Sequence, residues 1–534
     1  MATPIQDILN LITLHYGGPG GAAAVIKDGE LIAQRVWGHA DMDQRIAMTP
    51  EIQMPICSIT KQFMCALLQD LKRNPTAAMT AKGNTEEQFT ESFNAVLDPQ
   101  LTRDTGLTLD NLCDMQSGLR DYWAMTTLWG AKPDDEFLVH RDIRPMLERT
   151  KSFHFEPGTE YSYSNVNFTA LGRIIERVTG ETLGKLLSER VLDPAGMTTA
   201  LLCPNNAELP PPCVGYEGND QVGYFQALNR MEWSGDAGLV ASLTDMISYE
   251  KYLDSLIYDP QSWYHSVAKP HTYNDGTPAN YHYGLSRVDI DDVKTLGHGG
   301  ALRGYRIHRR HAPGERLSVV VFFNHEADAS AAVEDILRAI LKKPNPEFPP
   351  VEPSPSWVGI FLDQETQLAI TVSKGARMGD ILISYSGGPE TIKLTDPNNG
   401  KSRSMVATVA GDVLLVHRIS ENRILEARRL QPSKSSIKDT VLQGKYHSAE
   451  VDSIFHCTGE AGILYGFFDG YLGQGHAAPI RYLGDDVWAL KCPRGLDAPA
   501  PGDWTMVLKR DDKGAVVSFV IGCWLARGVE FFRI

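Results

Sequence analysis

Residues 52–61, with the sequence IQMPICSITK, join a short apolar run to the first turn of a predicted helix. The helix is indicated by apolar residues at the spacing of one buried face, namely Met64, Leu67, Leu68 and Leu71. Ser58 therefore lies at a helix start, where backbone N–H groups and the positive end of the helix dipole face it. Lys61 follows three residues later on the same face, within reach of the Ser58 hydroxyl.

Ser58 and Lys61 together have the chemistry of a nucleophile and its base. A lysine amine that is partly buried beside other donors can lose its proton and then accept one from an alcohol. Chance supplies about one or two Ser-x-x-Lys patterns in a chain of this length. Residues 435–438, SSIK, repeat the pattern with no helix predicted behind it. The assignment of Ser58 therefore depends on further motifs.

A second polar motif, Tyr163-Ser164-Asn165, stands between a Pro-Gly turn and another predicted helix. A tyrosine in this position can relay a proton between a nucleophile and a leaving group. The Asn165 amide can contact both a lysine and a substrate carbonyl. A packed tyrosine and a helix-capping asparagine would explain the same residues without any chemistry.

A third motif, His298-Gly299-Gly300-Ala301, precedes a predicted strand. The glycines, Gly300 among them, would let a substrate lie against the strand edge. The Ala301 N–H is then predicted to form an oxyanion site together with the Ser58 N–H. A histidine beside glycines also fits an ordinary turn, so this motif gains its meaning from the other two.

In order and spacing, these three motifs resemble those of class C β-lactamases, DD-peptidases and related esterases. Flanking stretches are similar too: Met48-Thr49-Pro50, Asp114-Met115-Gln116-Ser117-Gly118-Leu119 and Gly235-Asp236-Ala237-Gly238-Leu239-Val240. The resemblance covers nearly all of residues 1–341 and implies an α+β, β-lactamase-like catalytic domain, an antiparallel sheet flanked by helices. It also implies an acyl-enzyme mechanism in which Lys61 and Tyr163 form the proton-accepting pair, with the choice of base between them left open.

The third motif departs from the β-lactamase pattern, because a lysine usually stands where this chain has His298. A neutral histidine is a weaker partner for a substrate carboxylate. With two C-terminal barrels, the pattern resembles bacterial D-aminopeptidases of the penicillin-recognising serine hydrolase superfamily. That resemblance implies release of N-terminal D-residues, D-alanine especially, from peptides, amides or esters. It also implies a loop from the last barrel toward the active site; residues 467–476 are the candidate, with Asp469 pairing with the substrate ammonium, although a plain hairpin turn fits equally.

The chain is expected to divide at a proline-rich linker over residues 342–355. The preceding residues 1–341 show a hairpin around Asp28-Gly29, a helix from Asn165 to Gly180, a second hairpin after residue 302 and a terminal helix through Leu341. The following residues contain short alternating runs with turn signals. They predict two small antiparallel β-barrel domains, residues 356–430 and 441–534, joined by a linker over residues 431–440.

The amino-acid composition excludes some classes of function. A formal net charge of −15 argues against nucleic-acid binding, which needs concentrated Lys and Arg. No apolar stretch approaches the roughly 20 residues that span a bilayer, and no signal peptide is predicted. Eight irregularly spaced cysteines suit a reducing cytoplasm. We expect a small peptide, amide or ester substrate and no metal or cofactor, and a homodimer stays open.

Two kinds of alternative remain at this point. Within hydrolases, the chain could be an esterase, β-lactamase or DD-peptidase whose barrels serve another purpose. In a different class, it could be a catalytically silent scaffold or binding protein on the same fold.

Overall fold

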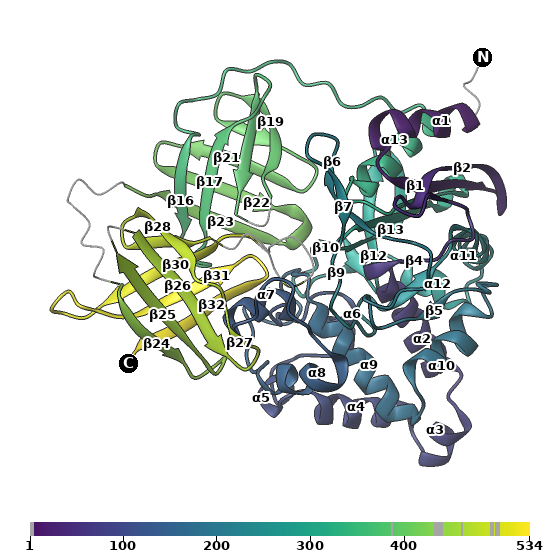
Figure 1. The fold of residues 1–534 in the computed structure, drawn as a ribbon, viewed down its shortest axis with the longest axis horizontal. Helices are drawn as coiled ribbons and strands as arrows, with labels where there is room; N and C mark the ends of the chain where they lie inside the picture. The colour runs from purple at the N-terminus through teal and green to yellow at the C-terminus, as the bar shows by residue number, and fades with distance from the viewer. Residues whose placement is uncertain (1–4, 386–387, 432–441, 461–462, 492–495, 497–501) are drawn as a thin grey trace.

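The computed structural model describes residues 5–385, 388–431, 442–460, 463–491, 496 and 502–534. Figure 1 shows an N-terminal α+β part, in purple to teal, beside two β-barrels in green and yellow. This arrangement confirms the predicted fold class. Among the described helices, none combines the length and apolar character needed to cross a membrane.

An eight-stranded antiparallel sheet forms the centre of the α+β part. Its strand order is β11-β12-β13-β14-β15-β1-β2-β3. In that order the strands are Tyr281–His282, Leu285–Ile290, Val293–Leu302, Tyr305–Ala312, Leu317–Phe323, Gly20–Lys27, Glu30–Asp41 and Ile46–Ala47. In sequence order β1 is the first strand of this sheet and β15 is the last, and these two strands pair directly, with Ala24 opposite Val320. The hairpins predicted around Asp28-Gly29 and after residue 302 are therefore neighbours in one sheet.

Helices cover both faces of this sheet. On one face, α1 (Ile5–Tyr16) and α13 (Ala329–Leu341) lie side by side and share a core with β1 and β15 (Figure 1). The other face packs against α11 (Leu243–Leu256) and a larger helical layer. That layer contains α2 (Thr60–Arg73), α3 (Ala77–Lys82), α4 (Thr85–Val96), α5 (Pro99–Thr102), α6 (Leu109–Cys113), α7 (Tyr122–Leu128), α8 (Val139–Glu148), α9 (Asn165–Thr179), α10 (Leu183–Leu187) and α12 (Trp263–Val267).

Most residues of helix α2 are buried. Its predicted apolar face is confirmed, since Met64, Leu67, Leu68 and Leu71 are all buried. A 3-10 turn at Cys57–Ile59 precedes it. The short strand β4 (Met54–Pro55) leads into that turn and pairs with β8 (Leu239–Ala241). This pairing brings the Gly235–Val240 stretch beside the start of α2.

The first C-terminal unit is a closed eight-stranded barrel with its own core. Its strands are β16 (Gly359–Asp363), β17 (Ala369–Lys374), β18 (Asp380–Ser384), β19 (Glu390–Asp396), β20 (Asn399–Lys401), β21 (Met405–Ala410), β22 (Val413–Arg418) and β23 (Arg423–Arg429). Residues 343–354, which precede it, contain no helix or strand. Alternating buried and exposed residues in β21 and β22 account for the strand pattern seen in the sequence.

The second unit is also closed, because β25 pairs with both β24 and β26. Its strands are β24 (Gly444–Ser448), β25 (Ser453–Glu460), β26 (Ile463–Gly470), β27 (Gly473–Gln474), β28 (Ala478–Gly484), β29 (Val487–Leu490), β30 (Trp504–Arg510), β31 (Val516–Cys523) and β32 (Ala526–Arg533). The short strand β27 extends the edge at β26. Apart from Gln431, the predicted linker over residues 431–440 lies outside the described residues.

Both barrels contact the loop that leads to Tyr163. The buried Glu160 carboxylate accepts hydrogen bonds from Arg423 of the first barrel at 2.8 Å and from Arg527 of the second at 3.1 Å. The Tyr161 N–H donates to the Glu421 carbonyl at 3.1 Å. One acidic residue, three positions before Tyr163, therefore joins all three parts of the chain.

Candidate active site

A cavity of about 550 Å³ opens beside the start of α2, next to residues 298–302 of β13 and 306–308 of β14. Six of the residues predicted from the sequence line it: Ser58, Tyr163, Asn165, His298, Gly300 and Ala301. The α+β part also contributes Trp123, Trp233, Ala237, Gly299, Leu302, Arg306, Ile307, His308, Glu326, Asp328, Ala329 and Ser330. Leu525 of the second barrel completes the lining.

Lys61 lies beneath this cavity and is fully buried. Its Nζ donates hydrogen bonds to Ser58 Oγ at 3.1 Å, to Asn165 Oδ1 at 2.8 Å and to the Asp236 carbonyl at 2.6 Å. Burial lowers its pKa to about 8, although the nearby Asp236 and Asp121 carboxylates oppose the shift. The amine is therefore held against Ser58 and can lose its proton near neutral pH.

The backbone at Ser58 is held in an unusual turn. The preceding residue, Cys57, has a φ of 52°, a left-handed conformation that non-glycine residues seldom adopt. Strand β13 lies so close to this turn that a Cβ at Gly300 would be 2.3 Å from the Ile56 carbonyl oxygen. A glycine is required here because any side chain would push β13, with Ala301, away from Ser58.

The Tyr163 hydroxyl is hydrogen-bonded to Ser58. Its ring lies against Lys61, whose Nζ is 4.8 Å from the ring centroid. Burial raises the pKa of Tyr163 well above its ordinary value. The phenol therefore keeps its proton at physiological pH, whereas the amine of Lys61 is the group ready to accept one.

Two buried aspartates that the sequence reasoning did not single out support this group. Asp121, the N-cap of α7, accepts hydrogen bonds from the Asn165 N–H at 2.9 Å and from Asn165 Nδ2 at 3.2 Å. Burial raises the pKa of Asp121 to about 6. Asp236 Oδ2 accepts a 2.8 Å bond from the Tyr122 hydroxyl, which fixes the carbonyl that Lys61 contacts. Asp236 lies in the Gly235–Val240 stretch, which was the one available signal.

His298 contacts a residue that the sequence reasoning missed, Tyr281 of β11. The Tyr281 hydroxyl lies 2.9 Å from His298 Nε2, and His298 Nδ1 lies 2.6 Å from the Gly299 carbonyl. A carbonyl oxygen only accepts, so Nδ1 has the proton and Nε2 accepts from the tyrosine. Burial lowers the pKa of His298 to about 3, with the Lys61 charge acting in the same direction. His298 is therefore a neutral imidazole.

The structure does not bring Asp469 into the cavity. Asp469 is half-exposed on β26, its carboxylate lies 3.9 Å from His456 Nε2, and it is not among the described residues that line the cavity. Its hairpin instead packs on the end of α7, where the Leu472 N–H donates to the Trp129 carbonyl at 3.0 Å. Glycine at positions 470 and 130 permits this close approach, because a Cβ at Gly470 would lie 2.8 Å from the Trp129 carbonyl oxygen and one at Gly130 would lie 2.0 Å from the Gly473 carbonyl oxygen.

A different turn of the second barrel reaches the site. Leu525, between β31 and β32, lines the cavity, and its carbonyl accepts a 3.0 Å bond from the Asp121 N–H. The sequence around it, CWLAR, has neither glycines nor acidic residues, so no chemical signal distinguished it from other short turns.

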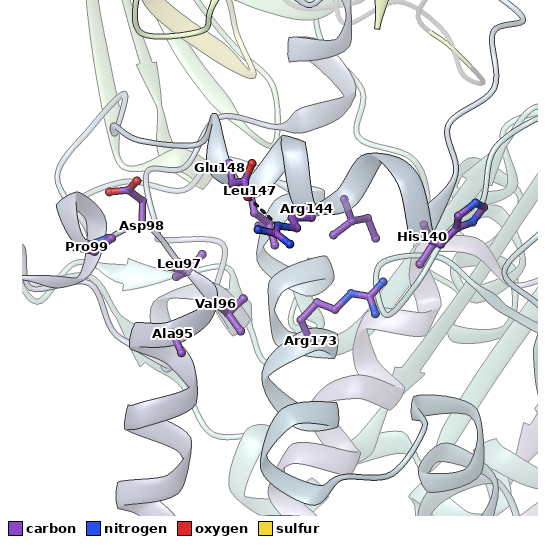
Figure 2. Close-up of a pocket in the computed structure, with 12 residues that line it drawn as sticks. Ala95, Val96, Leu97, Asp98, Pro99, His140, Arg144, Leu147, Glu148 and Arg173 are labelled. Atoms are coloured by element: carbon purple, nitrogen blue, oxygen red, sulfur yellow. Dashed lines mark hydrogen bonds and ion pairs between the residues drawn. The ribbon is translucent and has the colours of Figure 1, made fainter. Parts of the chain in front are cut away.

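A second cavity, of about 620 Å³, lies between α4, α8 and α9 (Figure 2). Its lining includes an Arg144–Glu148 ion pair of 2.8 Å, His140 and Arg173. None of the described lining residues is a serine, cysteine or lysine, so this cavity lacks the nucleophile and amine found beside Ser58.

Comparisons with known proteins agree with this geometry. The family model "Beta-lactamase" matches residues 5–342, and the model "D-aminopeptidase, domain B" matches residues 350–532. Curated relatives called D-aminopeptidase from Brucella canis and Brucella anthropi are each 40% identical, covering 99% of this chain and 98% of the relative.

Solved structures show the same fold. The D-amino acid amidase of Ochrobactrum anthropi SV3, complexed with D-phenylalanine, has a TM-score of 0.51 and 21% identity, covering 64% of this chain and 99% of its own. The octameric penicillin-binding protein homologue from Pyrococcus abyssi has a TM-score of 0.50 and 17% identity, covering 92% of this chain and 98% of its own. The resemblance drawn from the three motifs is confirmed, and the chain belongs to the D-aminopeptidase family, in which a β-lactamase-like part precedes the D-aminopeptidase domain.

Proposed function

We propose that this protein is a serine hydrolase that releases N-terminal D-amino acids from peptides, amides or esters through an acyl-enzyme on Ser58. The observation that supports it most directly is the buried Lys61 amine, 3.1 Å from Ser58 Oγ and with a pKa lowered to about 8. The D-stereospecificity rests on the 40% identical relatives called D-aminopeptidase. The −15 net charge is compatible with a substrate that has a free ammonium group.

Acylation begins with the neutral form of Lys61. Its two N–H groups donate to the Asn165 side chain and the Asp236 carbonyl, which leaves the lone pair directed at Ser58. Ser58 Oγ transfers its proton to that lone pair as it attacks the substrate carbonyl. The oxyanion that forms is stabilised by the backbone N–H groups of Ser58 and Ala301.

Collapse of the tetrahedral intermediate releases the amine. Tyr163 donates its phenolic proton to the departing nitrogen. It then regains a proton from Lys61, which received that proton from Ser58. Water then attacks the acyl-enzyme with the same groups in reverse roles, and the amino acid leaves. Each proton removed from Ser58 or water returns to the leaving amine or to Ser58, so the enzyme ends unchanged.

Asn165 and His298 act as positioning residues in this scheme. Asn165 is fixed by Asp121 and holds the Lys61 amine, while the neutral His298 keeps Gly299 and Gly300 in place at the edge of β13. A neutral imidazole here disfavours the rival activities that bind a substrate carboxylate, namely those of β-lactamases and DD-peptidases.

The test compares matched substrates on the purified full-length protein. Hydrolysis of D-alanine p-nitroanilide should exceed that of the L-form by at least about a hundredfold, a ratio that needs about 2.7 kcal/mol of discrimination. Nitrocefin and a short-chain ester measure the rival activities. Activity confined to the ester, or equal rates for both enantiomers, would contradict the proposal. If a Ser58→Ala variant retained hydrolysis, Ser58 would not be the nucleophile.

The chain is proposed to consist of a catalytic domain at residues 1–341 and two barrel domains at residues 356–430 and 441–534. Limited proteolysis would test these bounds, since cleavage is expected within residues 342–355.

A cytoplasmic location is also proposed, and the free thiols of Cys65, Cys113 and Cys203 support it. The proposed assembly is a homodimer, and analytical sedimentation would measure the mass of the particle in solution.

A further inference from the structure

Three side chains from separate parts of the sequence meet beneath the active-site wall. Asp114, at the C-terminal end of α6, is 1% exposed. His271 lies in the short strand β9 (His271–Thr272), and His282 lies in β11. Within the part of the chain that the structure describes, this is the one group of three such side chains whose ligand atoms all lie within 4.8 Å of one another.

Both histidines direct a ring nitrogen at the same carboxylate. His282 Nδ1 lies 2.8 Å from Asp114 Oδ1, and His271 Nε2 lies 3.1 Å from Asp114 Oδ2. The two imidazole rings are stacked, with centroids 4.4 Å apart and planes inclined by 14°. The stacking places the two nitrogens next to each other along the carboxylate, although they come from different hairpins.

These separations are close to those of a coordination shell. In a tetrahedral zinc site with bond lengths of about 2.0–2.1 Å, neighbouring ligand atoms lie about 3.3 Å apart. The two nitrogen–oxygen distances here end on different oxygens of the carboxylate, at 2.8 Å and 3.1 Å, and need to lengthen by about half an ångström or less to admit an ion. Two imidazoles and one carboxylate form a ligand set that suits zinc and other divalent first-row transition ions.

The surroundings also fit an ion site. The Tyr283 N–H donates to Asp114 Oδ1 at 3.1 Å, an outer contact of the kind that orients a ligating carboxylate. His271 is 33% exposed along its side chain, so solvent reaches the group from one side. That side offers an entry path for an ion and for a water molecule as the fourth ligand.

We propose that Asp114, His271 and His282 bind one divalent transition ion, Zn²⁺ or Co²⁺, with water completing a four-coordinate site. The ion is structural. None of its three ligands is among the described residues that line the cavity at Ser58, so it does not polarise the scissile carbonyl. It connects the end of α6 to β9 and β11, and β11 holds Tyr281 against His298. Metal binding thus stabilises the wall that positions the third motif.

Cobalt provides the direct test, because a four-coordinate Co²⁺ ion absorbs visible light. Full-length protein without a histidine tag is treated with a chelator, dialysed against CoCl₂ and measured for bound metal and absorption. We expect one Co²⁺ per chain with a d–d band, and competition by ZnCl₂ that removes the band. His271→Gln and His282→Gln should each lose the stoichiometric ion.

Two further variants keep the result interpretable. Asp114→Asn keeps the size of the side chain and an acceptor oxygen for one histidine but removes the anion, so it should weaken Co²⁺ binding while circular dichroism shows a folded chain. His417→Gln removes an exposed histidine of the first barrel and should leave binding unchanged. ZnCl₂ should raise the melting temperature of the wild-type and His417→Gln proteins by a few degrees, and not that of the His271 and His282 variants.

The proposal is overturned if the wild-type chain holds no stoichiometric Co²⁺. It is also overturned if both histidine variants still bind one ion, or if a thiolate charge-transfer band shows that cysteines are the ligands. None of these readouts uses hydrolysis, so a failure of the metal proposal is distinguishable from a failure of the proposed D-aminopeptidase activity.

Discussion

The hydroxyl of Tyr281 donates a 2.9 Å hydrogen bond to Nε2 of His298 and so fixes which ring nitrogen has the proton. His298 Nδ1 then donates to the Gly299 carbonyl. The imidazole thus connects β11 to the glycine edge of β13 as an uncharged group. A lysine at this position could not accept the tyrosine proton, which gives a physical reason for histidine in the third motif.

Replacing Tyr281 with phenylalanine should lower kcat by about tenfold with little change in KM. The variant leaves a buried imidazole nitrogen without its donor, which costs about 1–3 kcal/mol and loosens β13. Steady-state kinetics on D-alanine p-nitroanilide measures this. The matched control is Tyr264→Phe, which removes a similar Tyr264–His311 bond of 3.1 Å elsewhere in the core. Equal losses in both variants would refute a role specific to the site.

The pH profile of acylation should follow Lys61. Its pKa is lowered to about 8 and the neutral amine is the reactive form, so kcat/KM should rise with pH and level off above about pH 8. Stopped-flow acylation between about pH 6 and pH 10 tests this. Lys61→Arg, which keeps its proton throughout, should abolish the rise and most of the activity. A flat profile in the wild-type enzyme would exclude Lys61 as the base.

Gly300→Ala should reduce kcat by about a hundredfold or more. The new Cβ would lie 2.3 Å from the Ile56 oxygen, so β13 must move and the Ala301 N–H leaves the oxyanion site. Gly314→Ala serves as the control, since a Cβ there meets nothing within 4 Å. Normal activity in the Gly300 variant would show that the strand edge is not part of the oxyanion site.

Leu525→Ala should alter substrate choice more than it alters Ser58 chemistry. The side chain closes the cavity from the second barrel, while its backbone contact with Asp121 remains in the variant. We expect kcat/KM to shift by severalfold toward bulkier D-residues, with unchanged labelling of Ser58 by an acylating probe. Leu415→Ala, on an exposed strand of the first barrel, should change neither quantity.

Stability should depend strongly on one ion pair in the core. Arg309 and Glu250 are both fully buried and are joined by two hydrogen bonds. Glu250→Gln leaves the guanidinium without its counter-charge and should cost about 3–5 kcal/mol of unfolding free energy. Glu148→Gln, in the exposed pair with Arg144 (Figure 2), should change it by less than about 1 kcal/mol. Urea denaturation of the three proteins measures both values.

Local signals in the sequence were sufficient for most of the fold. The hairpin at Asp28-Gly29, the helix from Asn165 that ends at Gly180 in a left-handed cap, and the terminal helix α13 all occur as predicted. Each depends on residues within about 20 positions of one another, where periodicity and turn chemistry act. The closed barrels were predictable as a class for the same reason.

The supporting residues of the site were harder to predict because they depend on distant contacts. Asp121 meets Asn165 across 44 positions, and Tyr281 meets His298 from a strand of two residues. Neither the length of a strand nor the spacing of residues along the sequence identifies supporting residues of this kind. Asp469 failed for the opposite reason: its glycine-rich hairpin had the composition of an inserting loop, but Gly470 lets that hairpin pack on the end of α7.

Glu160 has a consequence for how the catalytic part depends on the barrels. Its carboxylate is bound by Arg423 of the first barrel and by Arg527 of the second. Loss of either barrel would leave this buried carboxylate with one cationic partner in place of two, three residues before Tyr163. The order of the catalytic tyrosine thus depends on two barrels that supply neither the nucleophile nor its base.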